Sequence, residues 1–354
     1  MTSRWMFAGW RAAGFALCIA WLVCRTQAAA AGSADGQLEI YWIDVEGGAA
    51  TLMVTPRGES VLVDTGNPGR RDPQRIFDVA AKVAGLRKID YLVTTHFHRD
   101  HFGGAATLAA LLPIGVVYDN GEFEGGVERP DQDYLSFAAQ RRAVIEPGQE
   151  IPLKQSPDKS APRLSLRCLA ARQQFAAAPD DADENAAICQ DARAKARDGS
   201  DNANSIVLLL SLGEFQFFDG GDLTWNMEQK LVCPKNLVGE VDVYQTTHHG
   251  LDASNNPLVI RSLKPKVAVF NNGVTKGCEP DVFAALQREP SVEAVYQMHR
   301  NLRSDSQNNV ADEYIANLEK ECQANYIRLA VDPAAGSYTV SIPARGHERT
   351  FAVK

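Results

Sequence analysis

The sequence predicts an α+β fold in which two mixed β-sheets pack face to face and helices cover their outer faces. Three observations predict this four-layer αββα sandwich. Apolar segments of strand length recur in both halves of the chain, helical segments alternate with them, and each half ends one buried strand in a group of histidines. Two sheets that share a core and carry helices outside satisfy that order.

In the first half, short apolar segments bounded by turn residues indicate strands, and longer segments indicate helices. One helix is well delimited, because Asp72 suits its N-cap, Pro73 suits its first turn and Gly85 suits its end. A buried strand leads directly into His96. The expected strands cover residues 37–45, 50–55, 60–63, 89–94 and 115–118, and the expected helices cover 72–83 and 105–112.

The second half resumes this alternation after a stretch at about 121–200, which contains acidic and alanine-rich pieces. We expect that stretch to hold two or three strands and a surface excursion. A buried strand then leads into His248 and His249, and a hairpin closes the chain. The expected strands cover 205–212, 215–218, 241–246, 267–270, 294–296, 326–331 and 337–342, and the expected helices begin near 225 and cover 257–263, 282–288 and 311–322.

Length and composition indicate a globular protein, with 354 residues of which 45% are hydrophobic and 23% charged. We expect one domain at about 35–354. Residues 1–30 are typical of a secretory signal peptide, because Arg4 and Arg11 flank the start of an apolar stretch and alanines follow it. The stretch is shorter than the ~20 residues of a membrane span, although an uncleaved anchor is the alternative. We therefore expect a periplasmic or secreted protein without a membrane span after cleavage.

Charge and cysteine content narrow the function classes. Removal of residues 1–30, which hold three arginines and no acid, takes the net charge from −8 to −11. This acidic chain carries no strong signal for nucleic-acid binding, which depends largely on Lys and Arg at phosphates. Five cysteines remain, so at most two disulfides can form. We expect the pairs Cys168–Cys189 and Cys278–Cys322, although the spacing does not fix the connectivity and several could be buried apolar side chains.

The strongest chemical signal is the run TTHFHRDH at residues 94–101. His96 and His98 are two residues apart, so in extended backbone they point the same way and can converge on one cation. Asp100 and His101 follow where the chain must turn, and can face a second cation. Imidazole and carboxylate are ligands for zinc and related metals. A polar loop before a helix is the alternative, but the chain has only seven histidines and three of them lie here.

This run resembles the His-x-His-x-Asp-His signature of the metallo-β-lactamase superfamily. Three further segments resemble other motifs of that superfamily, namely VDTG at 63–66, GGDL at 220–223 and VYQTTHHG at 243–250. The last of these, together with NSIVL at 204–208, is similar to the branch typified by the hydrolase-like domain of competence (DNA-uptake) proteins. The resemblance implies the αββα sandwich and a metal-dependent hydrolase.

The resemblance also implies a ligand set for two metal ions, expected to be zinc, with manganese or iron as alternatives. His96 and His98 would bind the first ion. Asp100 and His101 would bind the second ion, with His248 completing that site.

Three further residues are carried over from the superfamily. Asp222 would bridge the two ions, so Asp222 and Asp100 are the expected catalytic carboxylates. Asp64 would support the metal-binding loop. If the match of this chain to the His-His-Gly motif is wrong by one position, His249 replaces His248 as a ligand. Otherwise His249 has a supporting or structural role.

The sequence departs from the superfamily pattern in two places. Many members carry a third histidine for the first metal, but this chain has none between His101 and His248. Asn204 lies near the expected place, and an amide oxygen is a weaker ligand for zinc. Competence-like proteins also usually carry a histidine where Cys278 and Glu279 precede a proline here, so nuclease activity does not carry over directly.

Two other polar residues could reach the substrate. His299 follows an expected strand and could be a substrate contact or an acid, with a surface or capping role as the alternative. Asn272 could bind substrate, or could make a turn with the glycine that follows it.

The expected chemistry is attack by a metal-bound hydroxide on a phosphorus or carbonyl centre. A small or oligomeric anionic substrate with a phosphoester is the first hypothesis, by resemblance to the competence-like branch. Hydrolysis of an ester, lactone or amide, including a β-lactam, is the second. A non-catalytic binding or sensing protein on the same fold is an alternative of another class, and an iron-based electron-transfer or oxygenase role is a further one. The fold alone does not choose among them.

Overall fold

The computed structural model describes residues 1–2, 36–180, 182, 184–303, 308–332, 334 and 336–354. The expected signal peptide at 1–30 therefore lies almost wholly outside the described residues. Within them, no helix is long and apolar enough to cross a membrane.

The described residues form two mixed β-sheets. The first sheet contains β1 (Leu38–Trp42), β2 (Thr51–Val54), β3 (Ser60–Val63), β4 (Ile89–Val93), β5 (Ile114–Asp119), β6 (Ala139–Val144), β15 (Ile327–Asp332), β16 (Ser337–Ile342) and β17 (His347–Ala352). The strand order is β17-β16-β15-β1-β2-β3-β4-β5-β6. Pairing is antiparallel from β17 to β3 and parallel from β3 to β6.

The second sheet has the order β14-β13-β12-β11-β10-β9-β7-β8. Its strands are β7 (Leu164–Ala171), β8 (Gln174–Phe175), β9 (Val207–Leu212), β10 (Phe215–Asp219), β11 (Val243–Gln245), β12 (Val267–Phe270), β13 (Ala294–His299) and β14 (Ile315–Asn317). The strands from β10 to β14 are parallel, and those from β8 to β10 are antiparallel. Both sheets are thus mixed, as the sequence predicts.

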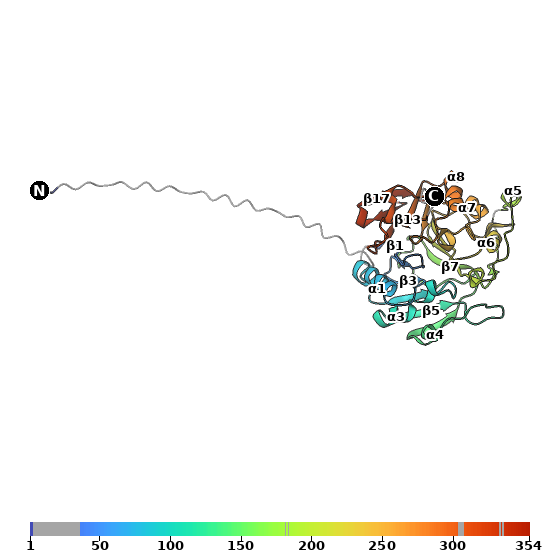
Figure 1. Ribbon diagram of the computed structural model, residues 1–354, viewed down its shortest axis with the longest axis horizontal. Coiled ribbons are helices and arrows are strands. Elements are labelled where there is room, and N and C mark those ends of the chain that lie inside the picture. The colour runs from blue at the N-terminus through green and yellow to red at the C-terminus, as the bar shows by residue number, and fades with distance from the viewer. Residues whose placement is uncertain (3–35, 181, 183, 304–307, 333, 335) are drawn as a thin grey trace.

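Helices cover the outer face of each sheet, on opposite sides of the molecule (Figure 1). They are α1 (Arg71–Phe77), which continues as the π-helical η1 (Asp78–Val83), α2 (Arg99–Phe102), α3 (Ala105–Leu111), α4 (Gln132–Ser136), α5 (Ala186–Cys189), α6 (Trp225–Val232), α7 (Pro257–Leu263) and α8 (Pro280–Arg288). The shorter 3₁₀ segments are η2 (Asp201–Asn204), η3 (Thr247–Gly250), η4 (Asp312–Tyr314) and η5 (Pro343–Arg345).

Three apolar clusters fill the three interfaces of this four-layer arrangement. The cluster between the sheets includes Trp42 and Phe217, whose rings pack edge to face with centroids 5.6 Å apart. A second cluster packs α1 and α3 on the first sheet through Ile76 and Leu108, and a third packs α6 to α8 on the second sheet. Burial of apolar area in these interfaces is the main stabilising contribution, and it fixes which strand ends face each other.

A polar network also joins the two sheets. The buried Gln245 side chain accepts hydrogen bonds from Trp42 Nε1 at 2.7 Å and Thr51 Oγ1 at 2.8 Å, and donates to Asp219 Oδ1 at 2.9 Å. Buried polar groups need such partners, because an unpaired one retains its full desolvation cost. Gln245 therefore holds the ends of β1, β2, β10 and β11 together.

Two local predictions are wrong. Residues 311–322 form η4, the strand β14 and an irregular segment, because the buried Ile315 and Asn317 pair with β13 in the sheet and this packing overrides helix propensity. Asp72 is not the N-cap of α1, since the cap position is Arg70. The Asp72 carboxylate instead accepts from the backbone N–H of Asn67 at 2.7 Å.

The expected disulfides are also wrong. The structure joins Cys189 to Cys233, at the ends of α5 and α6. Cys168, Cys278 and Cys322 form no disulfide with any residue that the structure describes. Spacing along the chain could not reveal this pairing, since the excursion that carries Cys189 is placed beside α6 only by tertiary packing. The excursion at 121–200 does contain the three expected strands, β6, β7 and β8.

Candidate metal centre

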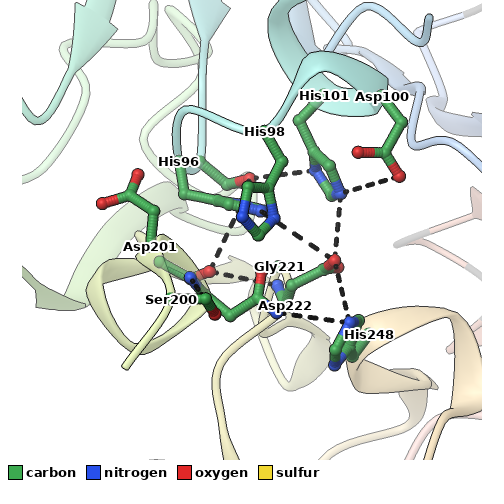
Figure 2. Close-up of polar contacts among 12 residues, drawn as sticks. His96, His98, Asp100, His101, Ser200, Asp201, Gly221, Asp222 and His248 are labelled. Atoms are coloured by element: carbon green, nitrogen blue, oxygen red, sulfur yellow. Dashed lines mark hydrogen bonds and ion pairs between the residues drawn. The ribbon is translucent and has the colours of Figure 1, made fainter. Parts of the chain in front are cut away.

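The run at residues 94–101 leaves the end of β4 and turns into the short helix α2. His96 is fully buried, and its Nε2 lies 3.0 Å from Nδ1 of His98. Figure 2 shows both imidazoles pointing toward Asp222 from the same loop. The extended backbone at His98 (φ −86°, ψ 144°) brings the two side chains to one side, as their spacing predicts.

Two groups of potential ligands share this region. His96, His98 and Asp222 form one group, and Asp100, His101 and His249 form the other, with the donor atoms of each group within 4.8 Å of one another. Asp222 Oδ2 lies between them, 3.1 Å from His101 Nε2 and 3.3 Å from His249 Nε2. The bridging role of Asp222 stays a prediction.

Asp222 reaches this position because of the glycines before it. Gly221 has φ of +53°, in the left-handed region, and a Cβ there would lie 3.1 Å from the Cβ of Thr95. Its carbonyl oxygen also accepts a hydrogen bond from the backbone N–H of His248 at 2.9 Å. The glycine turn thus packs closely on the histidine loop and carries the His248 segment beside it.

The segment η3 provides the last histidines from a strained backbone. His248 and His249 both have positive φ, 54° and 58°, a conformation that non-glycine residues rarely adopt. His249 points to the second ligand group, with Nε2 3.8 Å from Asp100 Oδ2. His248 Nε2 lies 3.6 Å from Asp222, and its Nδ1 lies 3.3 Å from Ser254 Oγ. The structure therefore groups His249, and not the expected His248, with Asp100 and His101.

Asp64 contacts one ligand candidate, His101, and the loop residue Thr95. Its carboxylate lies 2.7 Å from His101 Nδ1 and accepts from the backbone N–H and hydroxyl of Thr95 at 2.8 and 2.7 Å. A ring nitrogen that donates to a carboxylate leaves the other nitrogen of that ring to bind a metal. Asp64 thereby directs Nε2 of His101 toward Asp222.

Electrostatics hold the imidazoles of this region in different protonation states. Burial opposes the charged form of His101, but the carboxylates of Asp222, Asp64 and Asp100 outweigh it and raise the pKa of His101 well above its ordinary value. Burial lowers the pKa of His96 well below its ordinary value, and burial also lowers the pKa of His249. Burial opposes ionisation of Asp222, but the facing imidazoles of His101, His249 and His248 outweigh it and lower the pKa of Asp222. Metal binding requires neutral imidazoles and ionised carboxylates, so an ion bound here would displace the proton of His101.

The donor set fits a metal ion. Nε2 of His249 is fully buried and makes no hydrogen bond among the described residues, although it lies near Asp222. A buried polar atom in this position is costly unless something else binds it. Imidazole nitrogens and carboxylate oxygens converging from three segments of the chain suit zinc or a related divalent ion.

Asn204 does not supply the missing third ligand of the first group. Its Nδ2 donates to Asp201 Oδ1 at 2.9 Å and its Oδ1 accepts from Gln173 Nε2 at 3.0 Å, so both polar atoms are used in the local fold. The amide nearest the site belongs to Asn202, whose Nδ2 lies 3.3 Å from Nε2 of His248. The Asn202 Oδ1 is buried and has no hydrogen bond among the described residues.

His299 and Asn272 have buried side chains that bond to neighbouring segments. His299 is fully buried, with Nε2 2.5 Å from Asp44 Oδ1. Asn272 is also buried, and its Nδ2 donates to the carbonyl oxygens of Gly273 and His299, each at 2.9 Å. Strand periodicity placed both residues near the sheet edge that carries the site, but it could not show that their side chains bond to neighbouring segments instead.

Two contacts to the site lay outside the sequence predictions. Glu128 Oε1 lies 3.0 Å from His98 Nε2, so it orients that imidazole from the loop before α4. Lys276 Nζ lies 2.5 Å from Asp100 Oδ2. Nothing in the sequence pattern around Glu128 marks it as a contact of the site.

Residues 43–166 match the sequence profile of the metallo-beta-lactamase superfamily. The chain carries a metallo-β-lactamase domain. The two facing sheets with outer helices are the metallo-β-lactamase fold, which confirms the fold that the sequence predicts.

Several known proteins are similar to this metallo-β-lactamase domain. ComE operon protein 3 of Bacillus subtilis is 26% identical over 265 residues, which cover 68% of this chain and 29% of that protein. A metal-dependent hydrolase of Cupriavidus metallidurans is 38% identical over 86 residues, which cover 23% of this chain and 26% of that protein. A metallo-β-lactamase crystallised with 2-mercaptoethanesulfonate has 13% identity and a TM-score of 0.34, with 76% of this chain and 77% of that chain covered. The chain thus spans less than a third of the length of these two curated relatives.

Proposed function

We propose that this metal-dependent hydrolase of the metallo-β-lactamase superfamily holds two metal ions and cleaves a phosphoester. One observation carries the proposal, namely that two three-residue ligand groups lie side by side around the single oxygen Oδ2 of Asp222. Two adjacent cation sites are the arrangement used for in-line displacement at phosphorus.

In this proposal each residue of the site has a separate role. His96 and His98 hold the first ion, while Asp100, His101 and His249 hold the second. When bound, such ions lower the pKa of a water molecule and polarise the substrate oxygen. Asp64 and Glu128 keep the imidazoles of His101 and His98 oriented.

Two hollows are lined by charged side chains of both signs, since Glu279 and Asp281 join the cations of one and Asp198 joins those of the other. Lys276 is partly exposed beside Asp100 and borders a hollow of about 580 Å³ that Thr275 and Arg303 also line. A second hollow of about 480 Å³ is lined by Lys195 and Arg197. Both hollows border Asp252, in the segment that follows η3. A phosphoester can pair its charge with the cations of these hollows.

The test is hydrolysis of bis(p-nitrophenyl) phosphate by the purified chain with added zinc or manganese, run beside an aryl ester and a chromogenic β-lactam. We expect the phosphodiester to be turned over fastest, and His98→Ala to lose more than about 100-fold, since even supporting residues of a metal site cost 10–100-fold. His347→Gln is the matched control, because His347 packs on Tyr314 at the edge strand β17. Faster turnover of the ester or the lactam would contradict the phosphoester, and no turnover at all would favour the binding-protein alternative.

We also propose that the mature chain is exported. The disulfide between Cys189 and Cys233 supports this, because such bonds persist mainly in oxidising compartments. The apolar stretch within residues 1–30 supports it as well. Cell fractionation with N-terminal sequencing is the test. We expect a chain in the periplasm or medium that starts near residue 30, and a full-length cytoplasmic chain would contradict the proposal.

A further inference from the structure

A third group of metal-ligand side chains lies outside the candidate centre. Asp44 follows β1, His299 ends β13, and Cys322 lies in the irregular segment after β14. One donor atom from each lies within 4.8 Å of the others. Asp44 and His299 are almost completely buried, with 1% and 0% exposure, so this is not an exposed acidic cluster.

The contacts in this group are short and mutual. Asp44 Oδ1 lies 2.5 Å from His299 Nε2, and Asp44 Oδ2 lies 2.8 Å from the sulfur of Cys322. Glu46 adds a second carboxylate, with Oε1 3.3 Å from the same sulfur. Imidazole nitrogen, thiolate and carboxylate oxygen are the donors that zinc accepts, and four such donors complete a structural zinc site.

The charged side chains around the group carry a net negative charge that a cation would neutralise. Asp44 and Glu46 carry two negative charges, and Arg75 offers one positive charge to both, at 3.0 Å from each carboxylate. Arg71 also pairs with Glu46 through Nη1, but its Nε pairs with the carboxylate of Asp72. One negative charge is therefore left over in a largely buried place, where an unpaired charge is costly.

We propose that Asp44, His299 and Cys322 bind one zinc-like divalent cation, and that Glu46 supplies the fourth donor. On binding, the thiol of Cys322 releases its proton to solvent and becomes a thiolate. The ring proton of His299 moves to Nδ1, which has no hydrogen bond among the described residues. Two carboxylates, one thiolate, Arg75 and a divalent ion then sum to zero charge.

The cation would fasten three distant segments beside the catalytic loop. Asp44 and Glu46 precede Gly48 and Ala49, and the backbone N–H of Ala49 donates to the carbonyl oxygen of Asp100 at 3.1 Å. A reactive thiol is the other chemistry that Cys322 could supply. Burial and the two carboxylates raise the pKa of its thiol to about 12, which does not favour a free nucleophile.

Cobalt(II) substitution tests the site independently of hydrolysis. The ligand groups of the proposed catalytic centre contain no cysteine, so a thiolate-to-cobalt charge-transfer absorption in the near ultraviolet reports on Cys322. We expect the full chain loaded with cobalt to show this absorption. In Cys322→Ser we expect the absorption to vanish and the bound metal to fall by about one ion per chain, with the visible absorption of the remaining cobalt unchanged. Cys168→Ala, which alters a core cysteine, should keep the band.

Two outcomes would overturn the proposal. One is a folded wild-type chain that binds cobalt without the charge-transfer band, which would leave the group as a hydrogen-bonded tie between β1, β13 and α1. The other is a band that persists in Cys322→Ser, which would assign it to a different thiol. Neither outcome bears on the two-ion centre, whose own cobalt absorption comes from nitrogen and oxygen ligands.

Discussion

At the scale of single residues, the neighbouring histidines of η3 show how much one position in register matters. His248 and His249 both have left-handed backbone, and their side chains diverge. The His249 side chain meets Asp100 and Asp222, while that of His248 contacts Ser254. Alternation along β11 cannot decide between the two histidines, because the strand ends at Gln245, before either of them.

Substitution of each histidine separates their roles. We expect His249→Ala to lose the second ion, because it removes the buried Nε2 that faces Asp100. We expect His248→Ala to keep both ions at the two-ion centre and to change mainly turnover, since His248 contacts the centre through Asp222 alone. Zinc titration by calorimetry with the competing chelator EDTA measures this difference. If His248→Ala loses an ion and His249→Ala loses none, the ligand is His248, as the sequence predicted.

The sequence predicts a site residue well when its neighbours along the chain determine where its side chain lies. His96, His98, Asp100 and His101 lie in one short run, so spacing alone brings their side chains together. The tertiary environment decides the other cases. Asn204 bonds to Asp201 within η2 and to Gln173 between β7 and β8, and no sequence pattern reveals the approach of Gln173.

At the scale of elements, α6 carries a carboxyl group that the fold has to keep protonated. Glu228 is buried, and its Oε2 accepts from the backbone N–H of Asn256 at 2.8 Å. Burial raises its pKa from 4.5 to about 7. A group with a raised pKa stabilises the fold fully below its unfolded value and loses that contribution as the pH rises through the folded value.

Glu228→Gln should therefore change the pH dependence of stability. Between pH 4.5 and 7 the unfolded chain gives up this proton and the folded chain keeps it, so the wild-type free energy of unfolding should fall. The variant has no carboxyl group at this position, so its free energy of unfolding does not fall for this reason. We expect the difference in unfolding free energy, variant minus wild type, to be roughly 3 kcal/mol larger at pH 8 than at pH 4. Urea denaturation at both pH values measures the difference. If variant and wild type differ in unfolding free energy by the same amount at both pH values, Glu228 does not titrate in this range.

The disulfide between α5 and α6 gives a second prediction for elements. Cys189 and Cys233 are separated by 44 residues, so their bond restricts the unfolded chain considerably. We expect the double variant Cys189→Ser, Cys233→Ser to lose about 2–4 kcal/mol of unfolding free energy. Urea denaturation without reductant is the measurement. A loss below about 0.5 kcal/mol, the size of an ordinary surface change, would show that the bond adds no stability.

At the scale of the whole molecule, the alternation of apolar and helical segments was sufficient to predict the layers. The three apolar clusters correspond to the three interfaces of the expected sandwich. The pattern failed where a segment is short and its state is decided by a neighbour, as for β14, which pairs with β13. The site depends on the same architecture, because the histidine loop and Asp222 follow strands of different sheets, β4 and β10.

The measurement that tests the central claim most directly is anomalous X-ray diffraction at the zinc edge, from crystals of the chain grown with zinc. The account predicts two neighbouring anomalous peaks that share Asp222. One peak should be bonded to His96 and His98, and the other to Asp100, His101 and His249. A single peak in this region, or a second peak bonded to His248 while His249 is free, would contradict it.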